Sequence, residues 1–323
     1  MRAPHGKSCI PCPDGRTVVA VPVSHYRYAT KSPSGQGGRQ VEIDSISGAR
    51  CLILGQGYTG ARLARRLQSL GCTVVGVKRQ AADDDILAFG DPRIPELIRQ
   101  ADFILASVPP ADTDPVLALY GEALKAAPAR WIGYLSSTGV YGDARGAWVG
   151  EWAAIGAGRR SARIAADLAW QGLEARAPVH VFRLPGIYGP GRSALDRVRS
   201  GAAHRLRLEG PLAGHVFSRI HVEDIVTALI ESIRRPDGGV YNLADDEPAS
   251  GNAVIEYACH LLGVTPPPLD DFATAGLSPM ARDFYSECRR VANGRMKRYL
   301  LPQLAYPTYR EGLAAIWHEE QAR

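Results

Sequence analysis

The feature that most constrains this chain is a glycine-rich hexamer between a predicted strand and a predicted helix. Residues 51–54 (CLIL) form a short apolar run that leads directly into GQGYTG at 55–60. The following segment, 58–71, has apolar residues near helical spacing and ends in a glycine, which is a plausible helix stop. The pattern predicts a G-x-G-x-x-G turn from a buried strand into a helix.

Each glycine of this hexamer has a physical role in holding a dinucleotide. The first permits the tight turn, the second lets a pyrophosphate approach the backbone, and the third lets the helix pack on the strand. The helix N-terminus adds free N–H groups and a positive dipole end. The alternative is a tight turn without a ligand. The predicted cofactor contacts in this loop are Gly55, Gln56, Gly57, Tyr58, Thr59 and Gly60.

The end of the second predicted strand bears on the choice between NADP and NAD. Strand 72–79 ends in Lys78 and Arg79, at the place where NAD-preferring folds carry an acidic residue for the ribose hydroxyls. No carboxylate follows until Asp83. A pair of cations suits a 2′-phosphate, because Arg offers a planar fork and Lys a point charge. We therefore favour NADP, with a solvated basic turn as the alternative.

Strands and helices alternate along the rest of the chain. Predicted strands lie at 102–108, 131–137, 179–184 and 240–243, and predicted helices at 115–127, 161–176 and 222–235. This alternation predicts an α/β fold with a doubly wound parallel sheet of the Rossmann type. Val108 and Pro109 end one of the strands, and the prolines there fix a loop expected to run along the cofactor.

Composition argues against several other classes of protein. The 323 residues are 46% hydrophobic and 22% charged, with a net charge of +5. We find no basic run with interleaved aromatic residues, so nucleic-acid binding is not expected. No stretch approaches the roughly 20 apolar residues of a membrane span, and the N-terminus lacks the apolar core of a signal peptide. Scattered cysteines suit a reducing compartment, so a cytoplasmic protein is expected.

The first 48 residues differ from the remainder. They are rich in Gly, Pro, Ser and basic residues, and they predict a disordered extension, with a transit peptide as the alternative. Cys9 and Cys12 supply half of a zinc site, but no second pair with suitable spacing follows. No metal is therefore expected.

The segment GYLSSTGVYG at 133–142 resembles the extended short-chain dehydrogenase/reductase family, the NAD-dependent epimerase/dehydratase group. Four further stretches follow in family order, at 182–192, 218–230, 240–250 and 286–301. The resemblance implies a Rossmann domain over 49–190, to which 216–245 return. It also implies a smaller substrate-side domain formed mainly by 191–323.

In this family the chemistry usually rests on a Ser or Thr, a Tyr, and a Lys four residues after the Tyr. The tyrosinate exchanges a proton with the substrate, and the Ser or Thr orients the substrate oxygen. By resemblance, Ser137 matches the Ser/Thr position, and Ser136 beside it is expected to contact the cofactor. The helical tail at 164–167 then places the Tyr position on Arg159 and the Lys position on Arg163.

Two arginines thus stand where the family has its acid/base pair. Arginine stays protonated, with a pKa above about 12, so it cannot carry out ordinary proton transfer near neutral pH. Arg163 is expected to hydrogen-bond a ribose, and Arg159 to bind a carboxylate or phosphate. Other candidate proton donors, each more consistent with a packing or capping role, are Tyr134, Tyr141, Tyr188 and His221.

The loop at 184–191 (LPGIYGPG) follows a predicted strand. In the family this loop lies beside the nicotinamide, so Pro185, Gly186 and Ile187 are expected cofactor contacts. Arg219 belongs to a segment that touches substrate phosphates in the family, and it is a candidate for that role, with a surface or capping role as the alternative.

Two classes of function are consistent with these features. The first is an NADP-linked oxidoreductase, or an epimerase/dehydratase-like enzyme, acting on a small hydroxylated or carbonyl substrate. The second is a non-catalytic dinucleotide-binding sensor or scaffold, which the missing Tyr and Lys would suit. Family members often pair through a helix bundle, so the helices at 115–127 and 161–176 are candidates for a homodimer contact.

Overall fold

A computed structural model describes residues 46–81, 85–156, 161–235 and 237–322. All of these lie in one compact unit that begins at Ile43. The expectations for the N-terminal extension, for Cys9 and Cys12 and for Arg159 therefore lie outside the described residues. In the described ranges, no helix is long and apolar enough to cross a membrane.

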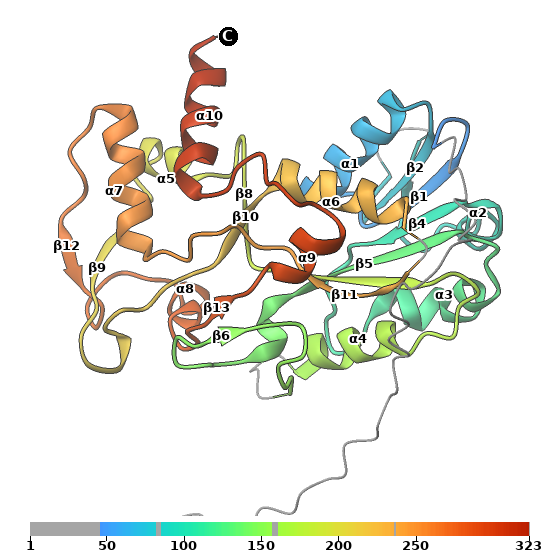
Figure 1. The fold of residues 1–323 in the computed structure, drawn as a ribbon, viewed down its shortest axis with the longest axis horizontal. Helices are drawn as coiled ribbons and strands as arrows, with labels where there is room; N and C mark the ends of the chain where they lie inside the picture. Colours follow the sequence, from blue (N-terminus) through green and yellow to red (C-terminus); the bar gives the residue numbers. More distant parts are fainter. Residues whose placement is uncertain (1–45, 82–84, 157–160, 236, 323) are drawn as a thin grey trace, which may run out of the picture. The chain divides into compact units, whose positions relative to one another are not determined.

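A seven-stranded parallel sheet forms the centre of this unit, as the alternation of elements predicted (Figure 1). Its spatial order is β11-β7-β5-β4-β1-β2-β3, and every neighbouring pair is parallel. The strands are β1 (Arg50–Leu54), β2 (Thr73–Lys78), β3 (Ile86–Ala88), β4 (Phe103–Ala106), β5 (Trp131–Ser137), β7 (Val179–Leu184) and β11 (Gly239–Asn242). Their central members are almost wholly apolar because both faces of the sheet are covered.

Helices cover the two faces of the sheet. One face packs against α1 (Tyr58–Ser69) and α6 (Val222–Ile233), and the other against α2 (Ile94–Gln100), α3 (Pro115–Ala126) and α4 (Ser161–Gln171). Side chains of β1 alternate between them: Cys51 and Ile53 join the α1–α6 core, whereas Leu52 and Leu54 join the other. This alternation is what the two-residue period of a strand requires.

The order of the strands places a crevice beside β1. From β1 the chain moves outward through β2 and β3, and it then returns to β4 on the opposite side of β1 before continuing through β5, β7 and β11. The connections that leave the carboxyl ends of β1 and β4 therefore diverge. In open parallel sheets this switch point is where ligands bind.

Short strand pairs and further helices lie beyond this sheet. The pairs are β8 (Gly186–Tyr188) with β10 (Arg219–His221), β6 (Trp148–Val149) with β13 (Arg290–Val291), and β9 (Arg205–Arg207) with β12 (Leu269–Asp271). The additional helices are α5 (Ala194–Arg199), α7 (Gly251–Leu262), α8 (Pro279–Phe284), α9 (Gly294–Tyr299) and α10 (Tyr309–Gln321). A separate apolar cluster joins α5, α7 and α10.

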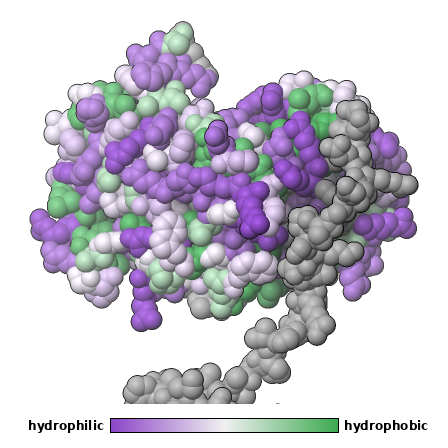
Figure 2. Space-filling view, viewed as in Figure 1, coloured by the Kyte–Doolittle hydropathy of each residue, from purple (hydrophilic) through white to green (hydrophobic). Residues whose placement is uncertain are grey.

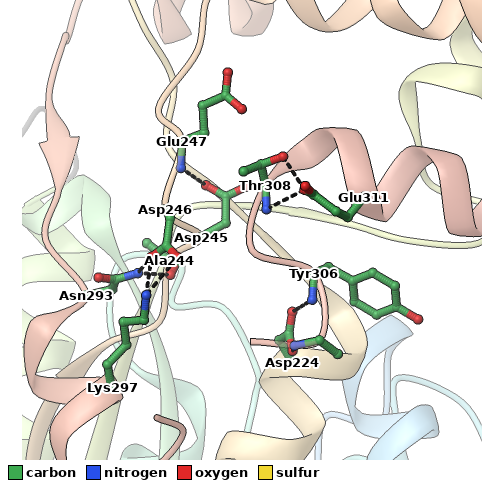
Figure 3. Close-up of polar contacts among 11 residues, drawn as sticks. Asp224, Ala244, Asp245, Asp246, Glu247, Asn293, Lys297, Tyr306, Thr308 and Glu311 are labelled. Atoms are coloured by element: carbon green, nitrogen blue, oxygen red, sulfur yellow. Dashed lines mark hydrogen bonds and ion pairs between the residues drawn. The ribbon is translucent and has the colours of Figure 1, made fainter. Parts of the chain in front are cut away.

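A buried carboxylate and a backbone hydrogen bond anchor the segment that leads into α10 (Figure 3). Asp224, in the first turn of α6, accepts hydrogen bonds from the backbone N–H groups of Ala305 and Tyr306 at 2.8 and 3.1 Å. The backbone N–H of Asp246 donates to the Pro307 carbonyl at 2.8 Å, and its exposed carboxylate forms an ion pair with Lys297 at 2.7 Å. The backbone of this segment is therefore fixed against α6 and against the loop after β11.

A fully buried ion pair joins α4 to the sheet. Arg183 of β7 donates to both carboxylate oxygens of Asp167, at 2.7 and 3.1 Å, and the two side chains are 3% and 0% exposed. Asp167 also accepts from the Ser136 hydroxyl at 2.5 Å and from Gln171 at 2.6 Å. Each charge thus has geometrically suitable partners, which is the condition for tolerating such a pair in a core.

Replacing one partner of the Arg183–Asp167 ion pair is expected to destabilise the fold strongly. Arg183→Met leaves the Asp167 charge buried without its partner, and the expected loss in free energy of unfolding is about 3–5 kcal/mol. Urea unfolding measures it. The double variant Arg183→Met/Asp167→Leu should recover most of the loss because no isolated charge remains.

The exposed pair Arg99–Glu96 of α2, at 2.5 Å, provides the control. Arg99→Met should cost at most about 1 kcal/mol, because exposed pairs contribute little. Equal losses from Arg183→Met and Arg99→Met would contradict the role assigned to the buried pair.

Candidate functional site

The glycine loop has the geometry that its sequence predicted. Gly55 has φ +96°, and a Cβ there would lie 2.9 Å from the side chain of Val108. A Cβ on Gly60 would lie 3.1 Å from the Ile53 side chain, so this glycine allows α1 to approach β1. Gly57 differs, because nothing lies within 4 Å of the position its Cβ would take. Two glycines serve the packing, and the middle one leaves open space beside the backbone.

The N-terminus of α1 has no side-chain cap. Its N-cap residue is Gly57, and its first turn contains no acidic residue. The long helices α3, α6, α7 and α10 are all capped by side chains, from Asp114, His221, Ser250 and Thr308. The first amides of α1 are therefore available to an anion, and the helix dipole favours one at this end.

The end of β2 is tied to this loop. The backbone N–H groups of Gly55 and Gln56 both donate to the carbonyl of Val77, at 3.0 and 2.8 Å. Lys78 and Arg79 follow immediately, and both are exposed. The two cations thus stand beside the glycine loop, at the carboxyl end of the neighbouring strand.

The other expected cofactor contacts lie at this same edge of the sheet. Val108 and Pro109 follow β4, and Val108 packs against Gly55 as described above. The loop after β7 carries Pro185, Gly186 and Ile187, and it continues into β8. Sequence positions from 55 to 187 therefore converge on the carboxyl ends of adjacent strands, which the parallel arrangement requires.

The two adjacent serines have different surroundings. Ser136 is buried, and its hydroxyl donates to Asp167. Ser137 ends β5 and caps a short 3₁₀ turn (Thr138–Tyr141), where its Oγ accepts from the Gly139 N–H at 3.1 Å. The hydroxyl proton of Ser137 remains available to a ligand. Ser137 is therefore the serine suited to orient a substrate oxygen.

Arg289 stands beside Ser137, and sequence reasoning did not single it out. Its Nη1 donates to the Gly142 carbonyl and to Glu287, the latter at 3.0 Å. A Cβ on Gly139 would lie 3.3 Å from Ser137 Oγ and 4.0 Å from Arg289 Nη2. A hydroxyl and a guanidinium therefore both lie close to Gly139. The only sequence signal was that Arg289 belongs to the late family motif at 286–301.

Of the two arginines at the family's Tyr and Lys positions, only Arg163 is described. It lies in the first turn of α4 and is half-buried. Burial raises the pKa of Tyr134, and the positive charge of Arg163 acts on this pKa in the opposite direction. Arg163 is therefore close to the Tyr134 phenol, on the α4 side of β5.

The tyrosines considered as proton donors are engaged in packing. Tyr141 donates to Asn242 at 2.7 Å and accepts from Arg183 at 3.0 Å, and burial raises its pKa. Tyr188 donates to the Thr308 carbonyl at 3.3 Å, and burial raises its pKa as well. Tyr134 stacks on Trp170 with ring centroids 5.0 Å apart. These phenols are held as structural groups, which is the role their motifs favoured.

Arg219, which was considered for contact with substrate phosphates, lies in the interior of this structure. Its guanidinium is buried, donates to the Ala249 carbonyl at 3.2 Å and lies over the ring of Tyr309. Asp245 lies nearby, and burial raises its pKa to about 8 against the opposing effect of the Arg219 charge. Arg219 and Asp245 are therefore part of an internal polar cluster that α10 covers.

The raised pKa of Asp245 predicts a pH-dependent stability. The folded protein keeps this proton up to about pH 8, whereas an unfolded Asp loses it near pH ~4. Between these values the folded state binds the additional proton, so the free energy of unfolding falls as the pH rises, by at most about 1.4 kcal/mol per unit. Asp245→Asn should remove this slope because the Asn side chain does not titrate. The Asn side chain can still accept the hydrogen bond from the Glu247 N–H, so the local structure should be kept.

Urea unfolding at several pH values between these limits measures the slope. The exposed Asp112 provides a matched control, and Asp112→Asn should leave the slope of the parent chain unchanged. An identical slope in Asp245→Asn and in the parent would contradict the assignment.

Comparisons with known proteins agree with this geometry. The sequence profile of the D-isomer specific 2-hydroxyacid dehydrogenase NAD binding domain matches residues 19–118, the region that contains the glycine loop. A functionally unknown conserved protein from Silicibacter pomeroyi is 41% identical, with a TM-score of 0.75, over 84% of this chain and 99% of that one. Protein YeeZ of Escherichia coli K12 is 28% identical over 240 residues, covering 67% of this chain and 84% of YeeZ.

More distant structures share the fold. The dTDP-glucose 4,6-dehydratase of Bacillus anthracis, solved in complex with NAD, is 18% identical with a TM-score of 0.64, over 85% of this chain and 97% of that one. The structural neighbours are proteins of the NAD-dependent epimerase/dehydratase type with a Rossmann fold. The resemblance drawn from the sequence motifs is therefore confirmed at the level of the fold.

Proposed function

We propose that this chain, which belongs to one family with the conserved Silicibacter pomeroyi protein and has the fold of the NAD-dependent epimerase/dehydratase group, is an NADP-linked oxidoreductase. Its substrate would be a small carbonyl or hydroxylated compound. The observation that carries the proposal is the uncapped N-terminus of α1 at the switch point of the sheet, beside Lys78 and Arg79.

The residues at this edge fit a nicotinamide dinucleotide. Open space at Gly57 and the free first amides of α1 suit the pyrophosphate, and the exposed cations Lys78 and Arg79 suit a 2′-phosphate. The loop at 185–187 would then lie beside the nicotinamide ring. When bound, the nicotinamide supplies or accepts the hydride.

Ser137 and Arg289 would act on the substrate oxygen. Both side chains lie beside Gly139, so a carbonyl oxygen bound between them would be near a hydroxyl donor and a guanidinium donor. Arg289 is held by Glu287 and the Gly142 carbonyl, so little reorganisation is needed. Because arginine keeps its proton, Arg289 would stabilise negative charge on that oxygen, while the proton itself would come from water.

The cofactor assignment predicts selective loss of NADPH binding on removal of the two cations. The parent chain should bind NADPH more tightly than NADH in a titration followed by tryptophan-to-nicotinamide energy transfer. In Lys78→Ala/Arg79→Ala, NADPH affinity should fall by at least about tenfold, because charge-assisted bonds to the 2′-phosphate are lost. NADH affinity should change little.

The exposed basic pair Arg234 and Arg235 provides a matched control. These residues follow α6, whose C-terminus lies toward the amino edge of the parallel sheet, away from the glycine loop. Arg234→Ala/Arg235→Ala should leave both affinities unchanged. Equal losses for NADPH and NADH in the Lys78/Arg79 variant would contradict the 2′-phosphate assignment.

The catalytic assignment predicts that Ser137→Ala and Arg289→Gln lower turnover without weakening cofactor binding. Each should reduce kcat/KM about 10²–10³-fold for any aldehyde, ketone or 2-oxo acid that the parent chain reduces with NADPH, because one oxyanion donor is removed. Arg290→Gln is the matched control, since Arg290 donates instead to the Gly146 carbonyl. Unchanged turnover in both site variants would contradict the assignment.

A non-catalytic dinucleotide-binding role is the second candidate. The arginine at the family's Lys position, Arg163, favours it, because the usual acid/base chemistry is not possible there. This role predicts tight NADPH binding in the same titration together with no NADPH consumption over the whole carbonyl panel. The two experiments together therefore separate the two candidates.

A further inference from the structure

A cavity of about 450 Å³ opens between α1, the N-terminus of α6 and α10. We call it the α1–α10 cavity. Figure 2 shows the surface indented on the α1 side of the projecting α10, with hydrophilic side chains around the indentation. The polar side chains that line the cavity are Arg62, Arg65, His221, Glu223, Tyr306 and Glu319.

Tyr58 of the glycine loop contacts Pro190, which lines this cavity. The Tyr58 hydroxyl donates to the Pro190 carbonyl at 3.1 Å, and Arg62 donates to the same carbonyl at 2.9 Å while lying over the Tyr58 ring. Arg62 also pairs with Glu223 at 3.4 Å. This ion pair is neutral overall.

His221 lines this cavity, and its ring is almost wholly buried. The side chain is 2% exposed, and its Nδ1 accepts from the Glu223 N–H at 3.3 Å. Burial, and then the charge of Arg62, lower the pKa of His221 to about 4, so the ring is neutral near pH 7. Its single proton therefore lies on Nε2. Within the described residues Nε2 has no hydrogen-bond partner, which is a costly state for a buried donor.

Arg65 adds a positive charge at the rim of the cavity. It is exposed, and it lies one helical turn after Arg62 on the same side of α1. Within the described part of the chain, Arg65 forms no ion pair. The N-terminus of α6 contributes further positive potential at the base. Glu319 of α10 lines the opposite side, so a ligand with a high negative charge would be repelled.

We propose that the α1–α10 cavity binds a small monocarboxylate, whose oxygens accept hydrogen bonds from His221 Nε2 and from the Arg65 guanidinium. A single negative charge can pair with Arg65, whereas a second one would face Glu319, and the two oxygens of a carboxylate match two separate donors. Pro190, Ala315 and Ile316 supply an apolar wall for the hydrocarbon part of such a ligand. The volume lies within the range of small-molecule sites.

The experiment titrates the full chain with sodium propionate, sodium benzoate and inorganic phosphate. Calorimetry gives the affinities, and ¹⁵N-histidine NMR reports the Nε2 environment, with the His221 signal assigned by its loss in His221→Asn. We expect at least one of the two carboxylates to bind saturably, with a Kd of about 1 mM or tighter, and to shift the His221 Nε2 signal.

Two variants test the contacts and one controls for charge. Arg65→Gln should weaken carboxylate binding at least about tenfold, and Arg66→Gln, the exposed neighbour outside the cavity, should leave it unchanged. His221→Asn should also weaken binding, while Asn still caps α6. Urea unfolding verifies that each variant is folded.

Three results would overturn the proposal. The first is the absence of saturation by either carboxylate up to about ten times that Kd. The second is an equal effect of Arg65→Gln and Arg66→Gln. The third is tighter binding of phosphate than of both carboxylates, which would show that the class of ligand is wrong.

Discussion

The close crossing at Gly55 determines where the rest of the site lies. Only a residue without a Cβ fits there, since the backbone turns with a positive φ against Val108 after β4. The same turn is tied to the end of β2 through the Val77 carbonyl. Three strand ends are thus held together at one point, and α1 begins directly beside it. Lys78, which ends the neighbouring strand β2, is thereby held beside the glycine loop.

The scaffold around α4 does not depend on the acid/base pair that the family usually carries there. Asp167 fixes α4 through Arg183 and Ser136, in the interior of the protein. Arg163 lies one helical turn before Asp167, on the same helix. The ion pair that holds the helix therefore lies outside its first turn, where the sequence resemblance predicts arginine at the family's Lys position.

The sequence predicted those parts of the structure that local patterns encode. The strands at 51–54 and 131–137 are apolar runs long enough to be recognised, and the glycine loop has a fixed spacing. The pair β6 and β13 has two residues in each strand, so it leaves no periodic signal. That pairing places Arg289 close to Ser137, although the two residues are 152 positions apart in the sequence. The burial of Arg219 was not foreseen for a similar reason, because α10, whose Tyr309 packs on it, was not predicted.

Helix α1 presents two different electrostatic surfaces, one at its N-terminus and one along its flank. Its N-terminus offers uncapped amides to the cofactor edge, and its flank carries Arg62 and Arg65 at the α1–α10 cavity. Arg62 donates to the backbone carbonyl of Tyr58, in the first turn of the helix, at 3.2 Å. A ligand that forms a hydrogen bond with Arg62 would therefore alter the turn that we propose holds a dinucleotide. Any such coupling must be reciprocal, because both binding events act on the same folded state.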